Sequence, residues 1–332
     1  MKTLRTARKA LAIACIVPLI AFGVAACGKD DASSAGGEIT INATSFPDYI
    51  DPQLSYTVEG WEVLWNVYTP LLTYRHARGE EGTEVVPALA EALPEISDDG
   101  LTYKLKLRPN MKYSDGTPIK ASDFTYAIQR LFKADSGGSV FYDVIVGAKE
   151  YADGTADTIT GITTDDTTGD ITIQLAAPNG TFENLLGLMF AAPVPPSTPL
   201  DSDATNSPPP SSGPFMISTV DAPRNLTMER NPQFQTVLDA GVTEVPDAGV
   251  DKITLIENKN QSAQVTDIIQ NKVDFMIDPP PADRLQELKT RFSDRFRMED
   301  SINTYYMFMN TERAPFNDLK VRQAINYAID PE

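Results

Sequence analysis

The sequence predicts an α/β fold, and three observations support this prediction. The chain has 332 residues and is 42% hydrophobic, which is enough for about two packed domains. From Glu38 onward, strand-like and helix-like patterns follow one another without a fixed repeat. Residues 250–277 have the order strand, helix, strand, which is typical of a βαβ unit with parallel strands and a right-handed crossover.

The N-terminal segment has the pattern of an export signal. Residues 1–9 carry four basic side chains and no acidic one, and residues 10–27 are uncharged. A basic start followed by an apolar run is typical of a secretory signal peptide, and a retained membrane anchor is the alternative. Residues 28–37 are polar and lack apolar periodicity, which predicts a flexible tether.

The folded part is expected to begin with a strand and a helix. Residues 39–43 favour a strand, which ends before the Asp51-Pro52 pair. Apolar residues then recur at helical spacing, which predicts one buried helix face made of Trp61, Leu64, Trp65, Tyr68, Leu71 and Leu72. Both tryptophans of the chain lie on this face. For Trp65 we favour core packing over ligand contact.

Two hairpin-forming segments flank a second predicted helix. Residues 103–108 alternate apolar and basic side chains, as a strand with one buried face does. Ser122 is placed to cap a helix whose buried stripe is Phe124, Ala127, Ile128 and Leu131. Residues 162–175 predict a hairpin around a polar turn at 165–170.

A proline-rich segment divides the chain. Between Pro193 and Pro214, eight of 22 residues are proline. Such a segment cannot continue a helix or donate to a sheet, so we expect a surface connection. A polyproline docking motif is the alternative.

The C-terminal part contains the βαβ unit and two further helices. Its crossover helix is expected over residues 261–270, ended by Asn271 in the left-handed conformation. The next helix would bury Leu285 and Leu288, two strand-like runs would lead to Asn310, and the last helix would span 321–329.

Composition and motifs exclude several kinds of function. With 28 basic and 46 acidic residues, the net charge is −18, which repels nucleic acid. One histidine, His76, and two cysteines are too few for the common structural zinc sites. The chain has no glycine-rich phosphate loop, no HExxH motif and no GxSxG motif. We therefore expect no cofactor, no metal and no catalytic residues.

Several sequence blocks are shared with one protein family in the same order. They are VPALAE (86–91), SDDGLTYKLKLR (97–108), YSDGTP (113–118), ASDF (121–124), SGPF (212–215), ERNP (229–232), VDF (273–275) and PFNDLKVRQAI (315–325). Together they resemble the family 5 extracellular solute-binding proteins, the peptide receptors of ABC importers, over about residues 39–332. The residues Val24-Ala-Ala-Cys27-Gly28 resemble the lipobox of bacterial lipoproteins, which implies lipidation at Cys27.

The resemblance implies a periplasmic-binding-protein-like fold of type II. Two α/β lobes would close on a ligand, lobe I would carry an extra subdomain, and the chain would cross to lobe II near residues 257–260. Lobe II would be incomplete in this chain. The implied boundaries are 1–26 for the lipoprotein signal peptide, 27–37 for the tether, 38–60 and 176–258 for the main part of lobe I, 61–175 for the extra subdomain, and 259–332 for the start of lobe II.

The resemblance also implies where a ligand would lie. Peptides in relatives lie extended in the cleft and pair with main chain, and the matching segment here follows Asp51-Pro52. The implied ligand-binding residues are Tyr56, Thr57, Val58, Glu59, Trp61 and Tyr142. A plain loop before the helix, and a core position for Tyr142, are the alternatives.

The implied function is non-enzymatic capture of di- and oligopeptides for an ABC permease with separate ATPase subunits. The protein would be a monomer held at the extracytoplasmic face of the cell membrane through lipid on Cys27. An oligosaccharide, a metal complex or haem is the alternative ligand on the same fold. A cell-surface hydrolase using carboxylates is a different class, although the pairs Asp98-Asp99 and Asp165-Asp166 lie in turn-forming sequence. A structural or adhesive surface lipoprotein is the third hypothesis.

Overall fold

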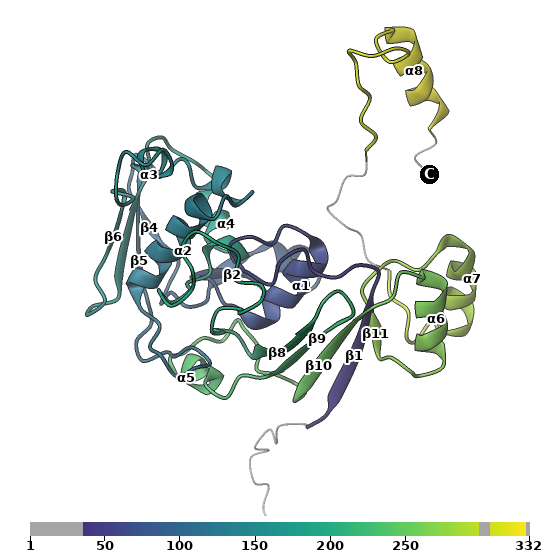
Figure 1. Cartoon of the computed structure of the whole chain (residues 1–332), viewed down its shortest axis with the longest axis horizontal. Coiled ribbons are helices and arrows are strands. Elements are labelled where there is room, and N and C mark those ends of the chain that lie inside the picture. The colour runs from purple at the N-terminus through teal and green to yellow at the C-terminus, as the bar shows by residue number, and fades with distance from the viewer. Residues whose placement is uncertain (1–35, 299–305, 330–332) are drawn as a thin grey trace, which may run out of the picture.

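The centre of the molecule is a five-stranded mixed sheet (Figure 1). The computed structural model describes residues 36–298 and 306–329, so the predicted signal peptide and Cys27 lie outside the described residues. The sheet has the order β11-β1-β10-β9-β8. Strand β1 is parallel to β10 and β11, and β9 is antiparallel to β10 and β8. Its strands are β1 (Glu38–Ala43), β8 (Phe215–Asp221), β9 (Asn225–Arg230), β10 (Lys252–Glu257) and β11 (Phe275–Met276).

Alternation along the strands gives this sheet one buried apolar face. Ile253 and Leu255 of β10 pair with Met228 and Leu226 of β9, and all four are buried. Helix α1 (Val58–Val67) belongs to the same hydrophobic cluster. The predicted strand at 39–43 is therefore confirmed, and α1 is the predicted first helix in a shorter form.

Helix α1 ends earlier than its apolar pattern predicts. Tyr68 has an extended backbone, and the next residues lead into strand β2 (Leu72–Tyr74), so Leu71 and Leu72 are not helical. Pro70 explains the difference, because the residue before a proline is disfavoured in helical conformation. The prediction of one helix face through Leu72 was wrong at its C-terminal end.

A second, four-stranded antiparallel sheet forms a separate part of the molecule (Figure 1). It has the order β4-β5-β7-β6, and helix α2 (Ala121–Lys133) packs on it through Phe124, Ile128 and Leu131. The predicted strand at 103–108 and the hairpin at 162–175 are confirmed. The strands are β4 (Glu95–Ile96), β5 (Thr102–Lys106), β6 (Ile162–Thr164) and β7 (Asp170–Gln174).

The predicted cap of α2 is wrong by two positions. The residue before the helix is Lys120, whose backbone N–H donates to the Asp123 carboxylate at 2.9 Å. Ser122 lies inside the first turn and donates its hydroxyl to Asp166 at 2.9 Å. An acidic side chain at the third helical position thus takes part of the capping role that the sequence suggested for a serine.

Smaller elements complete this part of the chain. The loop at 193–214 has no helix or strand, as its prolines predict. The short elements are β3 (Val85–Pro87), α3 (Ala148–Ala152), α4 (Phe182–Leu185), α5 (Phe234–Asp239), and the 3-10 helices η1 (Gly79–Thr83), η2 (Ser139–Phe141) and η3 (Met189–Ala191).

The predicted βαβ unit is present, with one difference. Helix α6 (Gln261–Ile269) connects β10 to β11, the two strands run parallel, and β1 lies between them. Asn271 has φ 55°, which confirms the left-handed end of this helix. Helix α7 (Ala282–Arg291) follows and buries Leu288.

Two segments near the expected domain boundaries join the five-stranded sheet. Strand β11 pairs with β1, and the expected start of lobe II is residue 259. Helix α1 packs on the same sheet, and the expected start of the extra subdomain is residue 61. The boundaries stay predictions, because sequence spacing does not reveal which sheet a segment joins.

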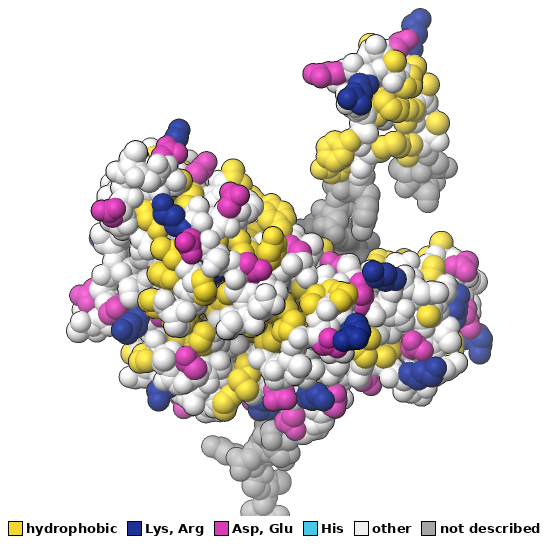
Figure 2. All heavy atoms as spheres, in the orientation of Figure 1, with side chains coloured by type: hydrophobic (Ala, Val, Ile, Leu, Met, Phe, Trp, Pro, Cys, Tyr) yellow, Lys and Arg dark blue, Asp and Glu magenta, His cyan; other side chains and the backbone are white. Residues whose placement is uncertain are grey.

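Helix α8 (Leu319–Ala328) contains no buried residue in this chain. Figure 1 shows it apart from the two sheets, and Figure 2 shows hydrophobic side chains along it. Part of the predicted strand pair before Asn310 lies outside the described residues, and residues 306–310 form no strand. Among the helices of the described residues, none has the length and apolar character needed to cross a bilayer.

Candidate ligand-binding site

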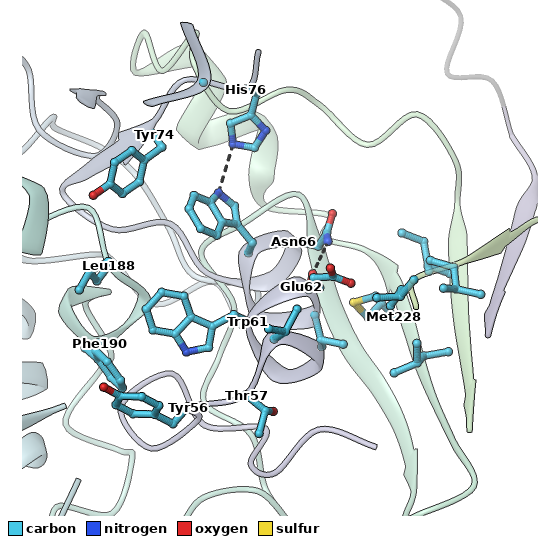
Figure 3. Close-up of a pocket in the computed structure, with 18 of the residues that line it drawn as sticks. Tyr56, Thr57, Trp61, Glu62, Asn66, Tyr74, His76, Leu188, Phe190 and Met228 are labelled. Carbon is cyan, nitrogen blue, oxygen red and sulfur yellow. Dashed lines mark hydrogen bonds between the residues drawn. The ribbon is translucent and has the colours of Figure 1, made fainter. Parts of the chain in front are cut away.

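A large apolar cavity lies between α1, the five-stranded sheet and the 3-10 helices η2 and η3 (Figure 3). Its volume is about 860 Å³, within the range of about 300–1,000 Å³ typical of small-molecule sites. The sheet contributes aliphatic side chains from β1, β9 and β10. The aromatic residues of the wall are Tyr56, Trp61, Trp65, Tyr74, Phe141, Phe190 and Phe275.

Four of these aromatic side chains form one packed group. Tyr56 stacks on Phe141 with ring centroids 6.5 Å apart and planes 18° apart. Trp61 meets Phe190 edge to face at 5.2 Å. A Cβ atom added to Gly138 would lie 2.7 Å from the Phe190 ring, so a glycine is required there. The group offers a rigid apolar surface, because aromatic pairs at these distances stabilise one another.

The segment before α1 is held in place by Asp48. Its carboxylate accepts hydrogen bonds from the Ser55 hydroxyl at 2.7 Å, the Tyr56 backbone N–H at 2.8 Å and the Thr57 hydroxyl at 2.9 Å. Burial opposes ionisation, but these bonds together hold the pKa of Asp48 below its usual value. Thr57 in turn caps α1 by accepting from the Gly60 N–H. The position of Tyr56 at the cavity wall follows from this network.

The polar groups of the wall are few. The Trp65 indole N–H donates to Nε2 of His76 at 3.3 Å, so this nitrogen carries no proton. Desolvation lowers the pKa of His76, although the charge of Glu244 opposes the shift. The guanidinium of Arg75 pairs with Glu84 at 2.9 Å and with Glu244 at 3.1 Å. His76 therefore carries no proton on Nε2, and the positive charge of Arg75 is balanced by Glu84 and Glu244.

Glu62 is the acidic residue of the wall. It lies on α1, and Figure 3 shows it among the residues that line the cavity. Desolvation, together with the nearby carboxylates of Glu59 and Asp278, raises the pKa of Glu62 to about 7. The cavity thus combines apolar walls with one carboxylate that titrates near neutrality.

The structure places the predicted ligand residues in two groups. Tyr56, Thr57, Val58 and Trp61 line the cavity. Glu59 is not among its lining residues, and its carboxylate accepts from the Ser45 hydroxyl at 2.8 Å.

Tyr142 is fully buried in the core of the second sheet, and its hydroxyl donates to the Leu185 carbonyl at 2.7 Å. The prediction that it lines the cleft was therefore wrong, and its neighbour Phe141 takes that place. Trp65 also lines the cavity, where core packing had been favoured. Glu62, His76 and Phe190 were missed, because a single acid, histidine or phenylalanine carries no motif.

One acid of each pair stabilises a turn. Asp99 accepts from the Ser97 hydroxyl and the Leu101 N–H, and Asp165 accepts from the Thr167 N–H. Within residues 36–298 and 306–329, no three histidine, cysteine or acidic side chains are grouped so that they could hold a metal ion.

Residues 84–332 match the model of the bacterial extracellular solute-binding proteins, family 5. The chain belongs to this family. The solved structure of the pheromone receptor PrgZ has a similar fold: it superposes with a TM-score of 0.74 at 24% identity over 89% of this chain and 57% of that chain. The predicted periplasmic-binding-protein-like fold is therefore confirmed.

Two curated proteins similar to this chain are named for different ligands. The periplasmic oligopeptide-binding protein OppA of Salmonella typhimurium is 29% identical over 261 residues, which is 70% of this chain and 42% of OppA. Heme-binding protein A of Haemophilus influenzae is 29% identical over 284 residues, which is 80% of this chain and 47% of the relative. The chain thus spans about half the length of the curated relatives it matches.

Proposed function

We propose that this chain is the ligand-capturing part of a peptide receptor of an ABC importer and catalyses no reaction. The observation that carries the proposal is the aromatic cavity at the start of α1. OppA, to which the chain is similar, is named as an oligopeptide-binding protein. The packed aromatic surface of Tyr56, Phe141 and Phe190 suits apolar and aromatic side chains of a short peptide.

The proposed receptor works outside the cytoplasm as a monomer. The basic start, the apolar run and the Val-Ala-Ala-Cys27 sequence support a lipid anchor on Cys27, with residues 28–37 as the tether. The chain carries no phosphate-binding loop in its sequence. Energy for import would therefore come from separate ATPase subunits that act on the permease.

Both tryptophans of the chain line the cavity, which provides a direct test. Titrating the full chain with di- to hexapeptides should change its tryptophan fluorescence and raise its melting temperature. Tyr56→Ala should weaken the binding of a phenylalanine-containing peptide by about tenfold, since one aromatic contact and its buried area are lost.

Tyr327→Ala is the matched control, because Tyr327 is an exposed tyrosine on α8 that does not line the cavity. It should bind as the unchanged chain does. Absence of stabilisation by every peptide tested would overturn the proposal. Binding of haemin without peptide binding would favour the haem alternative, which the similarity to heme-binding protein A supports.

A further inference from the structure

We propose that the ligand of this cavity carries a cationic group, an amine or a guanidinium, that pairs with Glu62. The inference rests on the proposed function and names the class of peptide that the site prefers. Glu62 of α1 lies among the residues that line the cavity (Figure 3). A carboxylate at an otherwise apolar wall selects ligands by charge, whereas the aromatic surface selects only by shape and apolar area.

The Glu62 carboxylate has no partner in the described part of the protein. No hydrogen bond or ion pair to its oxygens is present among residues 36–298 and 306–329, whereas its backbone carbonyl accepts from Asn66 at 2.7 Å. Acidic side chains at comparable positions are paired. Glu59 accepts from Ser45, and Asp278 accepts from the Thr44 N–H and hydroxyl.

The charged and titratable groups around Glu62 leave the site negative. Glu59 on the same helix and Asp278 after β11 act on it as like charges. The one cation of the wall, Arg75, is already shared between Glu84 and Glu244. Nε2 of His76 accepts a hydrogen bond from the Trp65 indole N–H, so this nitrogen carries no proton. No group of the wall therefore neutralises Glu62, and a cation on the ligand would do so.

The surrounding aromatic residues favour the same ligand chemistry. Trp65 follows Glu62 by three positions, which places the two residues next to each other on the helix surface. Cations bind well to indole faces, particularly where water is partly excluded. A lysine or arginine side chain, or the free amino terminus of a peptide, would pair with the Glu62 carboxylate next to the position of Trp65 on the helix.

Four tripeptides test the inference on the full chain and separate the two sources of the cation, which are a basic side chain and the free amino terminus. The probes are Phe-Lys-Phe, its N-acetyl form, Phe-norleucine-Phe and its N-acetyl form, which carries no cation. Dissociation constants are measured by tryptophan fluorescence for the unchanged chain, for Glu62→Gln and for Glu95→Gln. Glu95 is an exposed acid on β4, remote from the cavity, and matches the charge change.

For the unchanged chain we expect a cation-bearing probe to bind about tenfold more tightly than acetyl-Phe-norleucine-Phe. Glu62→Gln should remove this preference, whereas Glu95→Gln should keep it. A preference that follows lysine identifies a side-chain site, and one that follows the free terminus identifies an amino-terminal site.

If the preference follows lysine, the affinity for acetyl-Phe-Lys-Phe should also depend on pH. Because the pKa of free Glu62 is about 7, its ionised fraction rises about tenfold from pH 6 to pH 8, and binding of a cation should strengthen over this interval. The lysine amine stays protonated throughout, so the change reports the carboxylate. Glu62→Gln should abolish it.

Two results would overturn the inference, and they are distinguishable. If all four probes bind equally well, or if Glu62→Gln changes all four affinities by one factor, Glu62 does not discriminate between ligands by charge. The peptide-receptor proposal then still stands. If no probe binds the unchanged chain, the receptor proposal fails, and the inference fails with it.

Discussion

At the scale of single residues, a buried ion pair between Arg130 and Asp51 joins two distant parts of the chain. Arg130 and Asp51 are both fully buried and form two parallel hydrogen bonds of 2.9 and 2.8 Å. Arg130 also donates to Gln53 at 2.6 Å, and to the carbonyls of Pro199 and Ser202 in the proline-rich loop. One guanidinium thus holds α2, the turn before α1 and this loop together.

Removing one partner of this pair should destabilise the protein strongly. Arg130→Met leaves Asp51 as an uncompensated buried charge, so we expect the free energy of unfolding to fall by about 3–5 kcal/mol. Urea unfolding of the full chain measures the change. Arg224→Met, which breaks the exposed pair with Asp221, is the control and should leave the free energy of unfolding nearly unchanged, because solvent screens an exposed ion pair. Equal losses in the two variants would contradict the role given to the buried pair.

At the scale of elements, helix ends show where residues close in sequence are enough to predict a boundary. The end of α6 was predicted because Asn271 tolerates the left-handed backbone that it adopts, with φ 55°. The end of α1 and the start of α2 were predicted less well. At the end of α1, Pro70 outweighed the apolar pattern that continues to Leu72. At the start of α2, Asp123 takes the capping role that the sequence suggested for Ser122.

Substitutions at Asn271 should show this backbone preference. Asn271→Ala should be less stable than Asn271→Gly by about 1 kcal/mol, because alanine resists positive φ and glycine does not. Both variants lose the hydrogen bond from Arg295 to the Asn271 side chain, so their difference isolates the backbone effect. Thermal unfolding of the two proteins measures it, and identical stabilities would show that the helix end relaxes instead.

At the scale of the whole molecule, two hydrophobic clusters meet at α1. One lies on the five-stranded sheet and the other under the second sheet, and Trp61 packs against both. Gln53 adds a polar link, because its amide donates to the carbonyls of Phe190 and Ala192. The cavity lies where the clusters join, so its shape depends on both.

This shared region predicts that the two sheets unfold together. Leu255→Ala in the first cluster and Leu105→Ala in the second should each lower the free energy of unfolding by about 2–5 kcal/mol. In both variants we expect a single urea transition, with coincident curves from tryptophan fluorescence and far-UV circular dichroism. A separate early transition confined to Leu105→Ala would show instead that the second sheet unfolds on its own.

Most of the regular structure was predictable because it depends on neighbours close in sequence. Alternation gave the strand at 103–108 and the hairpin at 162–175, helical spacing gave α2 and α6, and proline content gave the loop at 193–214. The order of short blocks was enough to indicate the family. These signals are read within about ten residues, where propensity, turn chemistry and periodicity act.

The site depended on contacts that no local pattern contains. Its wall brings together residues near positions 56–65, 74–76, 141, 188–190 and 228–277. A shift of one residue put Phe141 at the cavity and Tyr142 in the core, and β11, in the stretch expected to start lobe II, pairs with β1. Glu62 looked like any other acid of a helix in a chain of net charge −18. Its distinct chemistry arises from the apolar surfaces and carboxylates that folding places around it, since solvation and charge act through space rather than along the chain.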